Sequence, residues 1–208
     1  MTNDDIFCQN ENIDFSAFVR IIRRKLTAHH ELYSMAPKAE YWEELLHRSL
    51  MEFGMKTDWK PDSNHKSGKD MVITESAWGL PGERISCKTG QTSGGTLKIS
   101  GSRLTKHKTL KEKIKFISDK KEDSYALLSK EKGCDERHYK LILFPSSLLD
   151  YGSATWRETT RNKHGNLNFA GTHEVFNARI EASCSDQLWT LIPDYEKNPS
   201  IQVFEIKV

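Results

Sequence analysis

Two stretches near the N-terminus carry hydrophobic residues at helical spacing. In the first, from about Asp14 to Tyr33, they recur every three or four positions, which is typical of an amphipathic helix with Asp14 as its N-cap. These residues are Phe15, Phe18, Val19, Ile22 and Leu26. A second helix is predicted from about Lys38 to Phe53, because it follows Pro37 and stops at Gly54, a residue suited to a helix C-terminal cap.

The pattern then changes to short apolar or alternating runs, which favour strands. Met71 to Thr74 and Arg84 to Lys88 are predicted as a hairpin, with the turn sequence WGLPGE between them. Further strands are predicted at 97–99, 124–129, 139–144, 174–183, 186–192 and 201–208. One more helix is expected within 108–117, with Leu110, Ile114 and Ile117 on one face and lysines elsewhere. The predicted fold class is therefore α/β, with a mixed central β-sheet flanked by helices.

Residues 150–173 form the longest poorly patterned segment, rich in Gly, Asn, Thr and charge. We expect a functional or mobile loop there, and plain surface irregularity is the alternative.

Composition narrows the class of protein. A chain of 208 residues that is 37% hydrophobic can bury a substantial core as one domain. It shows neither an apolar run of the roughly 18 residues that a membrane helix needs nor a secretion signal, so we expect a cytoplasmic protein without a membrane partner. The four cysteines lack zinc-site spacing and are expected to be free thiols. No HEXXH, phosphate-loop or GxSxG motif is present.

The net charge of +2 conceals a lysine-rich strip from Arg103 to Lys121. Such a strip makes a polyanion a candidate partner, and an ordinary solvated helix is the alternative.

The stretch SGKDMVITESAWGLPGERISCKTG carries the candidate chemistry. Asp70 opens the first strand of the predicted hairpin and Lys88 closes the second, so both side chains are expected at the same end of the sheet. Phosphodiester hydrolysis needs a hard divalent cation held by oxygen ligands and a positive group near the attacking water. Asp70 and Lys88 have this chemistry, although charged residues at strand ends are also common on ordinary surfaces.

The segments GKDMVI and ISCK resemble the PD-(D/E)XK nuclease superfamily, in which an acid opens one strand and an acid-X-lysine motif lies on the next. The segment YWEELLHRSLMEFGM looks like the first helix of these nucleases, with Glu43 as the matching acid. Helical spacing puts Glu43 at the edge of the apolar face and Glu44 away from it. The resemblance covers about residues 40–105 and is greatest to small type II restriction endonucleases.

The resemblance implies a restriction-endonuclease-like core and Mg²⁺-dependent cleavage of double-stranded DNA, with Mn²⁺ as a possible substitute. Asp70, Glu43 and a carbonyl near Cys87 would hold the metal, and Lys88 would orient or activate water. Ser86 stands where the family has its second acid, and it is expected at most to contact a metal-bound water.

A neutral hydroxyl replaces a carboxylate ligand poorly, so either another residue supplies the missing metal ligand or the site is weakened. Glu43 is the first candidate, followed by Glu75 and Glu83. Pro61 and Asp62 form a literal PD pair, but no apolar strand follows them. The side chain of Cys87 is expected in the core, because strand side chains alternate between the two faces.

Two polar groups are candidates for DNA contact, and ordinary solvated turns are the alternative for each. The first suits phosphates and comprises Ser100, Ser102, Arg103, Lys106 and Lys108. The second includes side chains able to reach base edges and comprises Arg157, Arg161, Asn162, Lys163, His164 and Asn166.

The expected organisation is a single nuclease domain over residues 1–208: a helical part (1–37), a catalytic core (38–125), and the remaining sheet with a DNA-contact loop and dimer interface (126–208). A homodimer is expected, because two copies related by a twofold axis would cut both strands of a palindromic site. Restriction implies a prokaryotic source. The alternatives are a related DNA nuclease acting in repair, recombination or restriction of modified DNA, and a catalytically inactive DNA-binding relative, which Ser86 motivates.

Overall fold

The computed structural model describes residues 14–60, 70–76, 82–119, 122–131, 133, 137–162, 164–182 and 186–208. Its α-helices are α2 (Phe15–Leu32), α3 (Ala39–Glu52) and α4 (Leu110–Ser118), and short 3-10 helices follow as η1 (Ser146–Leu148) and η2 (Tyr195–Lys197). Its strands are β1 (Met55–Thr57), β2 (Met71–Ser76), β3 (Arg84–Ser93), β4 (Thr96–Arg103), β5 (Ser124–Glu131), β6 (His138–Pro145), β7 (Thr155–Arg161), β8 (Leu167–Thr172), β9 (Asn177–Glu181), β10 (Gln187–Pro193) and β11 (Gln202–Lys207).

The first two helices begin and end close to the predicted residues. Asp14 caps α2, and its Oδ1 accepts a hydrogen bond from the Ala17 N–H at 3.2 Å. Gly54 follows α3 with φ at 95°, a left-handed conformation that glycine adopts at little cost. The apolar faces of both helices are buried, as their spacing predicts.

The described strands form one mixed sheet in the order β11-β6-β5-β3-β4-β10-β9-β8-β7, with β2 also paired to β3 and β1 paired to β2. The β3–β5 pair is parallel, whereas the other described pairs are antiparallel. Helix α4 lies in the connection that makes the parallel pair possible. The predicted mixed sheet with flanking helices is confirmed.

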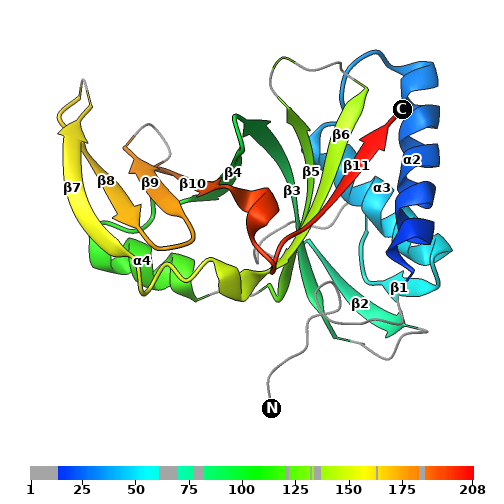
Figure 1. Cartoon of the computed structure of the whole chain (residues 1–208). Helices are drawn as coiled ribbons and strands as arrows, with labels where there is room; N and C mark the ends of the chain where they lie inside the picture. The colour runs from blue at the N-terminus through cyan, green and yellow to red at the C-terminus, as the bar shows by residue number, and fades with distance from the viewer. Residues whose placement is uncertain are drawn as a thin grey trace.

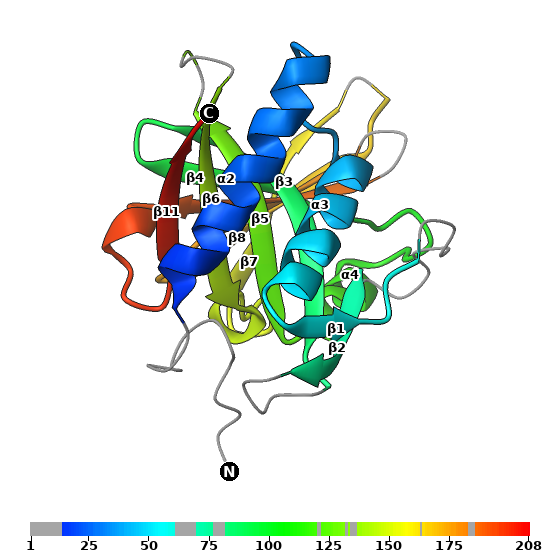
Figure 2. The ribbon, with the colours of Figure 1, turned by 90° about the vertical axis from the view of Figure 1, so that its right-hand side faces the viewer.

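The sheet has two parts, which we call the core half and the wing. In the core half, α2 and α3 cover one face of β3, β5, β6 and β11 (Figures 1 and 2). The wing consists of β4, β10, β9, β8 and β7, and it extends away from α2 and α3 with α4 along one of its faces (Figure 1). A second apolar cluster lies beneath the wing and includes Ile117 of α4, Ile180 of β9 and Leu188 of β10.

The segment 150–173 is not the loop that its sequence predicts. It contains both strands of the β7–β8 hairpin, at the outer end of the wing. Every β7 residue except Trp156 is exposed, so TWRETTR lacks the alternation of apolar and polar residues that marks a half-buried strand. The predicted DNA-contact loop is therefore an edge strand and a turn.

Helix α4 also departs from its prediction at one position. Lys113 is buried, although the lysines were expected away from the apolar face. Its Nζ lies 2.8 Å from Asp186 Oδ2, and the ion pair compensates the charge while the aliphatic stem covers apolar surface. Within the described residues, none of the helices combines the length and the apolar character that crossing a membrane requires.

Candidate active site

Strand β3 changes neighbours along one of its edges. On that edge β2 pairs with Arg84 and Ile85, whereas β4 pairs with residues from Gly90 to Ser93. On the opposite edge β5 pairs without interruption from Ile85 to Thr92. Among the described strands, none pairs with residues 86–89 on the first edge, and we call this opening the β3 gap. Its backbone groups must find other hydrogen-bond partners.

Asp70 provides such a partner. It lies just before β2, where its N–H donates to the Ile85 carbonyl at 3.0 Å. Its Oδ2 accepts hydrogen bonds from the Cys87 N–H at 2.5 Å, the Ser86 hydroxyl at 3.2 Å and the Lys88 ammonium at 3.3 Å. The Asp70 side chain is 7% exposed and that of Lys88 is 30% exposed, so a buried carboxylate meets a cation that solvent can reach. The predicted proximity of Asp70 and Lys88 is present.

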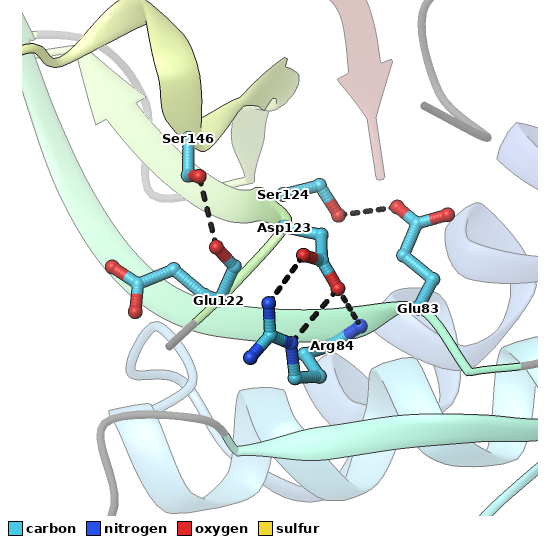
Figure 3. Close-up of polar contacts among 6 residues, drawn as sticks. All are labelled: Glu83, Arg84, Glu122, Asp123, Ser124 and Ser146. Atoms are coloured by element: carbon cyan, nitrogen blue, oxygen red, sulfur yellow. Dashed lines mark hydrogen bonds and ion pairs between the residues drawn. The ribbon is translucent and has the colours of Figure 1, made fainter. Parts of the chain in front are cut away.

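The start of β3 is held to β5 by a second acid and base pair, shown in Figure 3. Asp123 accepts from the Arg84 guanidinium at 2.6 and 3.0 Å and from the Arg84 N–H at 2.9 Å. Hydrogen bonds from Arg84 lower the pKa of Asp123, while partial burial opposes that shift. Side-chain alternation puts Arg84 on the same face of β3 as Ser86 and Lys88. The ion pair thus fixes the strand that carries the candidate site.

Neighbouring acids have other contacts. Glu83 accepts a hydrogen bond from the Ser124 hydroxyl at 2.6 Å, and Glu122 accepts one from the Tyr125 hydroxyl. The Glu122 carbonyl also accepts from Ser146, so this end of the sheet is densely hydrogen-bonded (Figure 3). Glu75 forms a surface ion pair with Lys56 at 2.7 Å. Of the proposed substitutes for the missing acid, Glu75 is therefore paired with a lysine on the surface, and Glu83 is hydrogen-bonded to a serine beside Arg84.

Glu43 is 8% exposed on the buried side of α3. The adjacent Trp42 fixes the helix over β5, because its Nε1–H donates to the Ala126 carbonyl at 3.2 Å. Glu44 instead points to the surface, where it pairs with Arg48 at 2.7 Å. The predicted difference between the two glutamates is confirmed.

Cys87 lies on β3 between Ser86 and Lys88, and its thiol is buried. The thiol lies in the cluster beneath α2 and α3, as its place in the strand predicts. Burial raises the pKa of Cys87 well above its ordinary value, the Asp70 and Glu43 carboxylates raise it further, and Lys88 opposes them. Asp70 also accepts the hydrogen bond from the Cys87 N–H, so its carboxylate lies beside this residue.

The donor set suits a hard cation. The described residues contain no group of three or more His, Cys, Asp or Glu side chains able to hold a metal. Mg²⁺, however, is commonly held by one or two carboxylates together with substrate phosphates. Cys87 directs its carbonyl to the same strand edge as its N–H, toward the β3 gap. Asp70, Glu43 and this carbonyl therefore offer oxygen donors, the kind of ligand that Mg²⁺ prefers.

The strand register brings part of the predicted DNA-contact set onto the wing. A single row crosses five strands through Arg157, Ala170, Arg179, Trp189 and Ser100. Arg103 lies opposite Gln187 beyond a register shift on the same pair of strands. Lys106 and Lys108 are exposed between β4 and α4, and Ser102 is exposed at the end of β4.

In the second predicted group, Arg161 and Asn162 already form hydrogen bonds within or near the β7–β8 turn. Arg161 donates to the Gly165 carbonyl at 2.7 Å. Asn162 accepts from the N–H groups of His164 and Asn166 at 2.9 and 3.0 Å, and it donates to the Ala182 carbonyl. The His164 side chain is exposed. Lys163, like Pro61, Asp62 and the cysteines other than Cys87, lies outside the described residues.

The sequence interpretation missed Lys98 and Arg179 on the same wing face. The alternation of polar and apolar residues in NARIE and TLKIS was the signal that could have found them.

Comparison with protein-family models and with curated proteins finds no match to this chain.

Proposed function

We propose that the chain is a Mg²⁺-dependent endonuclease of double-stranded DNA with a PD-(D/E)XK type of site, acting as a type II restriction enzyme. The observation that best supports this proposal is the position of the Asp70 carboxylate in the β3 gap, where it contacts Lys88, Ser86 and the Cys87 N–H. The order of an acid on a helix, an acid before a strand and a lysine on the next strand also supports the proposal.

The residues divide the reaction between them. Asp70, Glu43 and the Cys87 carbonyl would hold Mg²⁺, which when bound supplies positive charge to the scissile phosphate. Lys88 is close enough to Asp70 for an ion pair and exposed enough to orient a water molecule. The water oxygen bonds to phosphorus and loses a proton, one P–O bond breaks, and the leaving oxygen takes up a proton, so the products are a phosphate monoester and a free hydroxyl. Ser86 donates its hydrogen bond to Asp70 and so holds the carboxylate in place.

A homodimer forms part of this proposal, because cutting both strands of a palindromic duplex requires two copies of the site. Sedimentation of the protein with a cleavable duplex, in the presence of Ca²⁺, measures the number of chains in the complex.

The direct test uses a long unmethylated duplex, Mg²⁺ and matched substitutions. Asp70→Asn and Lys88→Met are each expected to slow cleavage by about 100-fold or more, since the first removes a carboxylate that would hold Mg²⁺ and the second removes the cation that orients water. Glu43→Gln is expected to slow it strongly and Glu44→Gln to leave it unchanged, because only Glu43 faces the sheet. Lys56→Met removes an exposed lysine as the control for Lys88→Met.

Discrete fragments from the parent and the controls alone would support a sequence-specific nuclease. Unchanged cleavage by Asp70→Asn or Lys88→Met would contradict the proposed site.

A second candidate function is DNA binding without cleavage. Ser86 favours it, because its hydroxyl donates to Asp70 where a second carboxylate would supply a ligand. In that case every version binds DNA, none cuts it, and calorimetry detects no Mg²⁺ or Mn²⁺ binding that depends on Asp70.

A further inference from the structure

The wing has one buried and one open face. In β10, Leu188, Thr190 and Ile192 are buried, whereas the alternate residues are half-exposed or exposed. In β9, Ala178 and Ile180 are buried, whereas the alternate residues are exposed. The buried residues face the cluster that includes α4, so the open face is the opposite one.

The open face is cationic. Arg157 and Arg179 share the row that crosses the wing, and Lys98 lies opposite Leu191 in the adjacent row. Glu181 is the acidic residue that β9 presents on this face. Among the described residues, no ion pair involves Arg157, Arg179 or Lys98. Their charges are thus available to a partner.

The spacing of these cations suits an extended polyanion. Neighbouring strands are about 4.8 Å apart, so Arg157 and Arg179 are separated by roughly 10 Å, and the whole row spans about 19 Å. A small anion would be held by converging donors, whereas here the cations spread over several strands. Such a distribution neutralises several phosphates of one nucleic-acid backbone.

Trp189 favours a duplex over a single strand. An exposed aromatic ring on a sheet can stack an unpaired base. Here the Lys98 ammonium lies 4.1 Å from the centroid of the Trp189 ring, so a cation–π contact covers the ring and holds the charge in place. The open face therefore presents cations rather than a free stacking surface.

The open face of the wing reaches the β3 gap along β3. Gln91 of β3 lies opposite Lys98 on the open face. Strand alternation puts Thr89, an exposed residue of the β3 gap, on this same face, whereas Lys88 points to the other face and contacts Asp70. A strand rises about 3.3 Å per residue, so the β3 gap begins within roughly 10 Å of this row.

We propose that the open face of the wing binds the phosphate backbone of duplex DNA and positions it toward the β3 gap. Duplex DNA as the partner rests on the proposed function; the open cationic face does not.

The test compares two double substitutions that remove the same charge. Arg157→Gln/Arg179→Gln alters the open face, whereas Arg20→Gln/Arg23→Gln alters exposed positions on α2, on the opposite side of the molecule. Binding of a fluorescent duplex is measured in EDTA, so that cleavage cannot contribute. Thermal melting confirms that both variants remain folded.

The open-face variant is expected to bind about 10-fold more weakly near 100 mM salt, with a salt slope shallower by about 1.8, because two phosphate contacts are lost. The α2 variant is expected to keep the parent affinity and slope. The inference would be overturned if the two variants bound the duplex with the same affinity, or if the parent did not bind the duplex. Tighter binding of single-stranded than of duplex DNA by the parent would overturn it as well.

The inference and the proposed function fail in distinguishable ways. Cleavage by the parent with normal duplex binding by the open-face variant would refute the inference and leave the nuclease in place. Loss of binding by that variant, with no cleavage by the parent, would support the open face and refute the nuclease.

Discussion

The core half and the wing use charged residues in opposite ways. In the core half, Lys88 pairs with Asp70 and Arg84 pairs with Asp123, at 3.3 and 2.6 Å. On the open face of the wing, Arg157 and Arg179 are exposed and, within the described residues, have no ion-pair partner. Burial makes an unpaired charge costly, whereas an exposed one costs little and attracts a distant anion. This difference fits the roles that we propose, a reaction site in the core half and a binding face on the wing.

Replacing one tryptophan in each part is expected to give the largest difference in stability between the core half and the wing. Trp42 is fully buried on the inner face of α3 and donates to the Ala126 carbonyl, whereas Trp189 is half-exposed on the wing. Trp42→Ala is expected to lower the free energy of unfolding by about 3 to 5 kcal/mol through a cavity and a lost hydrogen bond. Trp189→Ala is expected to lower it by less than about 1 kcal/mol. Urea unfolding measures both, and equal losses would show that the wing is packed like the core.

The buried face of the wing should nevertheless tolerate little added volume. A Cβ on Gly101 would lie 2.8 Å from Leu188 Cδ2 and 3.0 Å from its Cγ. Gly101→Ala is therefore expected to lower the free energy of unfolding by about 1 to 3 kcal/mol.

Leu188→Ala provides the internal control for this prediction, because it makes room for the new methyl group. The two changes together are expected to cost less than the sum of the single changes. Additive effects would contradict close packing between β4 and β10.

The smallest predicted effect concerns Asp123. Asp123→Asn is expected to lower the free energy of unfolding by about 1 kcal/mol near pH 7, because Arg84 is partly exposed and solvent screens the pair. The folded pKa of Asp123 is lowered, so its contribution is complete above the ordinary aspartate pKa of about 4 and is lost as the pH falls through the lower folded value.

Urea unfolding at pH 7 and below pH 3 measures this dependence. The difference between the parent and Asp123→Asn should shrink on acidification. A difference that grows instead would show that the carboxylate does not stabilise the strand pair.

Local sequence predicted the helices because their apolar spacing and end signals agree, as Asp14 and Gly54 illustrate. It missed β7 because that strand is solvated on both sides, so its residues do not alternate. The pattern correctly placed Asp70 just before a strand, but it predicted that Lys88 closes the next strand, whereas β3 continues to Ser93. It also did not reveal the change of partner along β3. That change depends on which strands pair, as does the contact between Arg84 and Asp123, which lie 39 positions apart.

The β3 gap makes the size of the site a matter of strand length. Since β2 and β4 share one edge of β3, adding a residue to the paired part of either strand would narrow the opening, and removing one would widen it. The strands that pair with the opposite edge need not move. An evolving or redesigned chain can therefore change the length of the β3 gap through the ends of two strands, without altering the buried interior.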